Sequence, residues 1–161
     1  MTQKKKPNVG TRNARKVRPI DPASAPRPKT TTEGLDGAMR ALELALDRKA
    51  LEPVLLDVRD LCSFCNYQLV LSGRSDRQVD AIADGISAGL KLEDMRPIGS
   101  EGARTGQWAL LDYGDFVIHV FLHSAREHYD LEGLWSDAPR IELDVPAEAR
   151  IPADASYDAV S

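Results

Sequence analysis

The sequence predicts an α/β protein, with a mixed α+β sheet of about five strands and helices packed on it. Two segments repeat apolar residues at helical spacing, and two later segments flank a Tyr-Gly turn as the strands of a hairpin. From Tyr67 to Gly99, a strand, a helix and a further strand follow one another, which is the pattern of a right-handed crossover. Crossovers make parallel pairs and hairpins make antiparallel pairs, so the order α-β-β-α-β-β-β-α gives a mixed sheet.

The first elements of the predicted domain are a helix and two strands. Leucine and alanine residues at helical spacing predict an amphipathic helix over residues 33–50, with Thr32 as its cap. Pro53 lies beyond this helix, where a proline ends helical structure. Short apolar runs then predict strands over residues 53–58 and 67–73.

A second helix and a third strand follow in the chain. Apolar residues at helical spacing predict the helix over residues 76–91. Ser75 is expected to cap this helix, and Gln78 stands three residues later, as in a capping box. After a loop, residues 96–102 are expected to form the third strand.

The hairpin and a final helix complete the predicted order. Residues 107–113 and 115–122 are rich in apolar and aromatic side chains and are joined by a short turn, which predicts two antiparallel strands. Residues 124–135 predict a short helix, with Ser124 as its cap and Glu127 at the capping-box position.

Charge divides the chain into a tail and a body. Residues 1–31 carry nine basic residues and one acidic residue, whereas the rest of the chain carries 12 basic and 24 acidic residues. We therefore expect a disordered basic tail over residues 1–31 and a folded domain over residues 32–137. Residues 138–161 are rich in proline and alanine with few apolar anchors, so we expect an extended C-terminal tail.

The composition excludes several classes of protein. No apolar run approaches the roughly 20 residues that span a bilayer, so we expect no membrane binding. The basic N-terminus lacks the apolar stretch of a secretory signal, and a cytoplasmic protein is the expectation. The acidic body argues against binding DNA, because duplex binding needs Lys and Arg to neutralise phosphates. It suits a basic protein partner instead.

Cys62 and Cys65 form a C-x-x-C motif in the run LCSFCN. This motif occurs in redox pairs and zinc sites, but a structural zinc site needs four ligands and no second such motif exists in the sequence. A thioredoxin-like pair opens a helix, whereas this run enters a predicted strand. We expect two buried or half-buried thiols in a strand-entry loop, with no metal and no cofactor, and a redox role is the alternative.

Two histidines in the hairpin suggest a possible metal site. His119 and His123 would share one strand face, but roughly 13 Å apart at about 3.3 Å per residue, so they do not ligate one ion together. His119 shares its face with Val117 and Phe121. The opposite face is expected to be core, and it carries Phe116, Ile118, Val120 and Leu122.

An enzymatic interpretation rests on the run SGRSDRQ (residues 72–78) and on Asp112 and Asp115. A Gly turn at a helix N-terminus is a natural anion site, as in nucleotidyltransferases, which hold metal with an Asp-x-Asp pair on a neighbouring strand. Here the two acids stand across a turn and do not project side by side from one strand. Turn hydrogen bonding is the better explanation for them, and we expect no enzyme.

Four motifs together resemble the ribosomal silencing factor family, also called Iojap-like. They are LSGRSDRQVDAIADGI, Glu101–Gly102, WALLDYGDFVIHVF and REHYDLEGLW, in the order and spacing of that family. The resemblance covers residues 35–135 and leaves both tails outside. One departure is the pair Cys65-Asn66, where the family usually has Thr-Asp, and this puts any role of that acid in doubt.

The resemblance implies a nucleotidyltransferase-like fold without the catalytic carboxylates. It also implies a translation repressor that binds the large ribosomal subunit through ribosomal protein L-fourteen and blocks joining of the small subunit when nutrients are short. Family members can form homodimers when free. Two alternatives stay open, a metal-dependent nucleotidyltransferase-like enzyme and a ribosome-assembly factor whose basic tail contacts rRNA.

We assign partner contacts to five residues of this domain: Trp108, Asp112, Asp115, His119 and Arg126. Trp108 is the candidate anchor because aromatic side chains often dominate interface energetics, and a place in the core is its alternative. Four further residues are expected in the core: Ile118, Val120, Tyr129 and Trp135.

Overall fold

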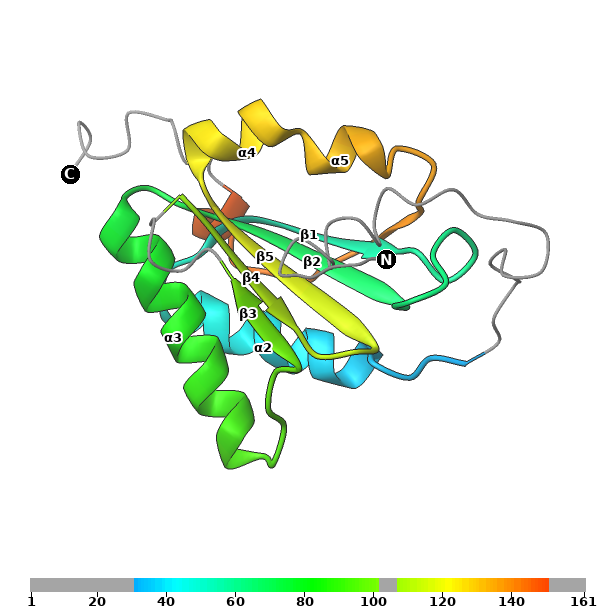
Figure 1. The fold of residues 1–161 in the computed structure, drawn as a ribbon. Helices are drawn as coiled ribbons and strands as arrows, with labels where there is room; N and C mark the ends of the chain where they lie inside the picture. Colours follow the sequence, from blue (N-terminus) through cyan, green and yellow to red (C-terminus); the bar gives the residue numbers. More distant parts are fainter. Residues whose placement is uncertain (1–30, 102–106, 151–161) are drawn as a thin grey trace, which may run out of the picture.

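A computed structural model describes residues 31–101 and 107–150, which form a six-stranded sheet with helices on both faces (Figure 1). The strands lie in the order β3-β4-β5-β2-β1-β6. Their bounds are β1 Leu51–Asp57, β2 Tyr67–Gly73, β3 Gly99–Glu101, β4 Trp108–Asp112, β5 Phe116–Leu122 and β6 Arg140–Ile141. The helices are α2 Leu35–Asp47, α3 Asp76–Leu92, α4 His123–Tyr129 and α5 Leu131–Leu134, followed by the 3-10 helix η3 Ala147–Arg150. The α+β class and the mixed sheet are thereby confirmed.

The centre of the sheet is the parallel pair β2 and β5. Every other neighbouring pair in the described sheet is antiparallel. Helix α3 connects the central strand β2 to β3, which lies at one edge of the sheet. Strands β4 and β5 then follow in order from β3 back toward β2, so that β5 lies next to β2. The hairpin therefore fills the space between the two strands that α3 connects.

Helices cover both faces of the central strands. Helices α2 and α3 lie on one face, and the shorter α4 and α5 lie on the other (Figure 1). Leu69 and Ile118 point into the α2–α3 layer, while Val70 and Phe121 belong to the cluster under α4 and α5. We expected only one face of residues 115–122 to be core, and this was wrong, because the face of His119 is also buried.

The N-terminal caps of α2 and α3 differ in how well the sequence predicted them. Ser75 caps α3 as predicted, and its Oγ accepts a hydrogen bond from the Gln78 backbone N–H at 3.1 Å. The first helix begins at Leu35, and its N-cap is Gly34, whose φ of 97° lies in the left-handed region, and not Thr32. The turn between β4 and β5 packs closely against Gly34, because an added Cβ at Gly34 would stand 2.7 Å from Asp115 Cβ. Position 34 therefore requires a glycine.

Strand β1 begins before Pro53, which we had placed at its start. The register between β1 and β2 shifts between Leu51 and Val54, which marks a bulge or irregularity at this proline. A bulge tolerates a residue that has no N–H to donate to the ladder. The strand therefore starts at Leu51, two residues earlier than predicted.

The last predicted helix is divided into two. Asp130 has a φ of 49°, which ends α4 and places its side chain so that Oδ1 accepts from the Gly133 N–H at 3.2 Å. This bond caps α5. The N-cap of α4 is Leu122 and not Ser124, because β5 leads directly into the helix.

Residues 138–150 are part of the folded body, and residues 151–161 of the predicted tail lie outside the described residues. We expected an extended tail from residue 138, but β6 pairs with β1 at the sheet edge and η3 follows it. Leu143 and Ala149 are both buried, so the boundary drawn at residue 137 was too early. The predicted tail at residues 1–31 lies, except for Thr31, outside the described residues.

Leu143→Ala should lower the free energy of unfolding by about 2–3 kcal/mol, since it removes a buried side chain from the cluster under α2 and α3. Glu142→Ala is the matched control, because Glu142 is exposed and adjacent. It should change stability by less than about 0.5 kcal/mol in urea unfolding. Equal, small effects would show that this segment does not pack on the core in solution.

Candidate functional site

The candidate site is built on the face of the sheet that α4 and α5 cover. Backbone pairing places Trp108 of β4 beside Phe121 of β5, and Phe121 beside Ser72 of β2. Helix α4 crosses this row, so its residues reach both the edge at Trp108 and the centre at Ser72. Two groups of contacts result, one aromatic and one polar.

The aromatic group contains Trp108, Phe121 and Tyr129. Their ring centroids lie 5.2 Å apart for Trp108 and Phe121, and 4.9 Å apart for Trp108 and Tyr129. Phe121 is fully buried, Trp108 is half-buried and Tyr129 is 49% exposed. We call these three residues the aromatic cluster. It is anchored in the core and presents an apolar surface to solvent.

A directional chain of hydrogen bonds lies beneath the aromatic cluster. The Trp108 Nε1–H donates to His119 Nδ1 at 3.3 Å, so Nδ1 carries no proton. His119 Nε2 therefore carries the proton and donates to Gln68 Oε1 at 3.0 Å. The Gln68 amide nitrogen then donates to Cys65 Sγ at 3.8 Å. We call this the His119 chain.

The His119 chain is inaccessible to solvent at its centre. His119 is 1% exposed and Gln68 is 3% exposed. Buried polar groups are stable when they satisfy one another, and here each donor faces an acceptor. His119 thus sets the orientation of the Trp108 ring, and its side chain does not reach the surface in this structure.

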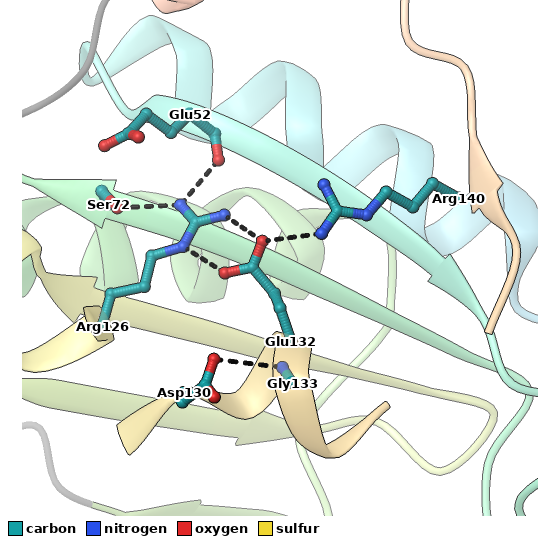
Figure 2. A network of polar contacts seen from close by, with 7 residues as sticks. All are labelled: Glu52, Ser72, Arg126, Asp130, Glu132, Gly133 and Arg140. Carbon is teal, nitrogen blue, oxygen red and sulfur yellow. Dashed lines mark hydrogen bonds and ion pairs between the residues drawn. The ribbon is translucent and has the colours of Figure 1, made fainter. Parts of the chain in front are cut away.

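Arg126 is the hub of the polar group (Figure 2). Its Nε and Nη2 atoms donate to the two carboxylate oxygens of Glu132 at 2.8 and 3.0 Å. Its Nη1 atom donates to the Glu52 carbonyl at 2.7 Å and to Ser72 Oγ at 2.8 Å. Arg140 stands 3.6 Å from the same Glu132 carboxylate. Arg126 therefore ties α4 to α5 and both helices to β1 and β2.

The ionisation of Glu132 depends on this network. Burial would raise the pKa of its carboxyl group, but the hydrogen bonds and charge of Arg126, together with the charge of Arg140, bring that pKa below the ordinary value of 4.5. The carboxylate is charged at neutral pH and holds the bidentate pair with Arg126. This pair is only 11% and 21% exposed at its two side chains, so solvent screens it weakly.

Two hollows of about 430 Å³ each adjoin Arg126 and Glu132. The first lies toward β6 and is lined by equal numbers of arginine and glutamate residues. The second lies at the start of α4, and acidic residues outnumber the one arginine there: Glu52, Glu127, Asp130 and Glu132. The second hollow therefore has a net negative lining.

The two acids of the hairpin turn lie away from the aromatic cluster. Asp112 is 8% exposed, and its Oδ1 accepts a hydrogen bond from the Gly114 N–H at 2.9 Å, which is the turn role favoured from the sequence. The Asp115 carbonyl accepts from the Asn66 N–H at 2.8 Å, and the residue is exposed. Asp112 stands four positions along β4 from Trp108, at the other end of the strand.

The structure therefore separates the five residues assigned to partner contacts. Trp108 and Asp115 offer exposed atoms at opposite ends of the hairpin, whereas His119 and Asp112 face inward. Arg126 is largely engaged by the polar group. Contact with a partner stays a prediction for all five.

The residues expected in the core fall into two groups. Ile118 and Val120 are fully buried under α2 and α3. Trp135 is half-buried beside the cluster under α4 and α5. Tyr129 is the exception, because the break at Asp130 leaves its ring over Trp108 with half of its surface exposed.

His123 begins α4, so it does not stand on the strand with His119 as we had assumed. Among residues 31–101 and 107–150, no group of three or more His, Cys, Asp or Glu residues is arranged to hold a metal ion. No helix in these same residues is long and apolar enough to cross a membrane.

The structure does not bring together the two groups of residues on which the enzymatic hypothesis depends, residues 72–78 and the hairpin acids. Ser72 pairs with Phe121, whereas Asp112 pairs with Val117, four residues along β5 and so roughly 13 Å away. At the start of α3, Ser75 Oγ and the Gln78 side chain already accept hydrogen bonds from backbone N–H groups. Gln78 Oε1 accepts from the Arg74 N–H at 2.6 Å. In a standard capping box it would accept from the N–H of the cap residue, Ser75.

Comparison with known proteins gives a consistent result. Residues 31–160 match the family model described as ribosomal silencing factor during starvation. This chain belongs to the ribosomal silencing factor family. A ribosomal silencing factor of Chromobacterium violaceum is 40% identical over 95 residues, which cover 59% of this chain and 78% of that protein. The factor of Bacillus subtilis is 38% identical over 98 residues, covering 61% and 83% of the two chains.

A solved structure agrees with the fold. A crystal structure of a protein from Chromobacterium violaceum superposes with a TM-score of 0.64 at 35% identity, and the match covers 75% of this chain and 98% of that one. The family resemblance inferred from the sequence motifs is thereby confirmed. Members of this silencing factor family carry the name of a regulator, not of an enzyme.

Sequence reasoning missed the structural role of three residues that organise the site. Gln68 and Ser72 are polar residues on one face of an otherwise apolar strand, and that pattern was the available signal for a buried polar network. Glu132 stands in the motif REHYDLEGLW, but the sequence assigned it no role of its own. Its bidentate pairing with Arg126 depends on the break at Asp130, which the sequence did not indicate.

Arg126→Ala should lower the free energy of unfolding by about 3 kcal/mol, because it leaves the weakly exposed Glu132 carboxylate without its bidentate partner. Arg96→Ala is the control, since Arg96 makes only a surface ion pair with Asp94. That control should cost less than about 0.5 kcal/mol in urea unfolding. A loss no larger for Arg126 than for Arg96 would contradict the anchoring role.

Glu132→Gln should show the contribution of the carboxylate through its pH dependence. The folded pKa of Glu132 lies below 4.5, so its charge adds stability above the unfolded pKa and loses that effect as pH falls through the folded pKa. The stability difference between the natural protein and the variant should be constant near neutral pH and shrink below about pH 4.5. Urea unfolding from pH 7 downward measures it, and a pH-independent difference would refute the assignment.

Proposed function

We propose that this ribosomal silencing factor binds the large ribosomal subunit through ribosomal protein L-fourteen and blocks joining of the small subunit. The observation that carries the proposal is the aromatic cluster, an anchored apolar surface on a domain of this family. Blocking by occupancy needs a surface and no catalytic group. A cytoplasmic location is part of this proposal.

The charge of the α4–α5 layer supports a basic partner. Glu127, Asp130 and Asp137 are exposed on or just after α4 and α5, while Arg126 is engaged by Glu132. The hollow at the start of α4 has a net negative lining and suits a lysine or arginine side chain. The same negative charge would repel neighbouring rRNA and so favour a basic protein surface over bare RNA.

The aromatic cluster has the form of an interface anchor. Tyrosine and tryptophan are enriched among the residues that dominate binding energy, and they act best when their geometry is fixed in advance. Trp108 is held by Phe121 below it and by His119 beside it, so little freedom is lost on binding.

Tyr129→Ala should weaken co-sedimentation with purified large subunits by about thirtyfold, as expected for loss of a dominant aromatic contact. The circular-dichroism spectrum should stay unchanged, because half of the ring is exposed. Leu92→Ala is the control, since Leu92 is 89% exposed at the end of α3 on the other helix layer. Equal binding by both variants would remove the aromatic cluster from the interface.

Excess protein should lower the fraction of joined ribosomes when subunits are mixed in sucrose-gradient assays. The effect should be lost in Tyr129→Ala and kept in Leu92→Ala. If excess natural protein leaves subunit joining unchanged, the proposed function is wrong. Binding that persists without any effect on joining would favour the ribosome-assembly alternative.

A further inference from the structure

We propose that Cys62 and Cys65 form a reversible dithiol–disulfide site that controls how Trp108 is presented. The two Sγ atoms are 3.5 Å apart, neither residue is in a disulfide in this structure, and both are 2% exposed. Neither residue has a part in the proposed ribosome contact. The coupling to Trp108 rests on the proposed function, whereas formation of the disulfide does not.

The geometry favours an intramolecular bond between the two sulfurs. A disulfide has an S–S distance of about 2.05 Å, so the sulfurs must approach by only about 1.5 Å. Both cysteines lie in the loop between β1 and β2, outside the two strands. Burial keeps other proteins away from the pair and disfavours disulfides between molecules.

The Cys65 thiol is protonated at neutral pH. Contact with Cys62 and burial raise the pKa of the Cys65 thiol, and the charge of Asp112 acts in the same direction. Thiols are poor nucleophiles when protonated, so mild oxidants react slowly. Ser63 between the cysteines is exposed, so the loop that carries them borders solvent.

The reaction with a peroxide balances without any further reactant. One cysteine sulfur attacks a peroxide oxygen and breaks the O–O bond, which gives a sulfenic acid and releases one water after proton transfer. The second sulfur attacks the sulfenic sulfur, forms the S–S bond and releases the second water. The two sulfurs lose two electrons in total, and the peroxide gains them. A dithiol reductant reverses the step by exchange.

The His119 chain transmits this change to the aromatic cluster. Movement of Cys65 Sγ toward Cys62 draws it away from the Gln68 amide, whose contact of 3.8 Å is already long. Gln68 is 3% exposed and must rotate to find another acceptor, which displaces its Oε1 from His119. His119 in turn orients Trp108 through a bond of 3.3 Å, so oxidation changes the position of the indole.

The first experiment tests the disulfide alone. The full chain is treated with hydrogen peroxide, then unfolded, alkylated and weighed as an intact protein. The expected product has lost two hydrogens and accepts no alkyl group, and dithiothreitol restores two alkylation sites. Uptake of two alkyl groups, sulfinic acids, or disulfides between molecules as the main product would overturn the proposal. Cys62→Ser and Cys65→Ser should each keep one alkylatable thiol after mild treatment, and circular dichroism checks their folding.

The second experiment tests transmission to Trp108. In a Trp135→Phe background, Trp108 is the remaining tryptophan, and its emission should shift when the disulfide forms. Gln68→Leu should still form the disulfide but lose the shift. A disulfide that leaves the emission of the Trp135→Phe protein unchanged would overturn the coupling, and an equal shift in Gln68→Leu would exclude the His119 chain as its route.

The third experiment links the site to ribosome binding. Oxidation should weaken co-sedimentation with large subunits by about tenfold, and the double variant Cys62→Ser/Cys65→Ser should bind equally before and after peroxide. An emission shift with unchanged, tight binding would overturn control of binding. If neither the reduced nor the oxidised protein binds large subunits, the proposed function fails, while the mass and emission results still decide the redox site.

Discussion

The parallel pairing of β2 with β5 is the constraint on which the rest of the structure depends. Because the two strands lie at the centre of the sheet, both of their faces need a cover of other elements. Helices α2 and α3 supply one cover, and α4, α5 and the loop between β1 and β2 supply the other. The second cover is thin, and it is the one that contains polar side chains.

Burial of polar groups under a thin layer explains the two networks. His119 and Gln68 would be costly in the core if each stood alone, but together with Trp108 they hydrogen-bond to one another. Arg126 and Glu132 solve the same problem by bidentate pairing. Both networks fix short elements in place with few apolar contacts, so the surface above them is organised in advance.

The elements predicted from the sequence were those whose signal is local. The strand over residues 67–73 and the Ser75 cap of α3 were predicted correctly, because apolar runs and hydrogen-bonding side chains act on their own neighbours. The two helices at residues 123–134 were predicted as one, since their break depends on the φ of Asp130. The edge strand β6 is two residues long, too short for any periodic signal.

The sequence by itself determined the family, the mixed sheet and the acidity of the body, because motifs, periodicity and charge can be counted along the chain. Only the tertiary structure decided that His119 faces inward, that Tyr129 is half exposed, and that Cys62 and Cys65 lie in contact beside Gln68. Alternation along a strand separates two faces but does not say what covers each one. That cover comes from elements distant in the chain, and here it is α4 and α5.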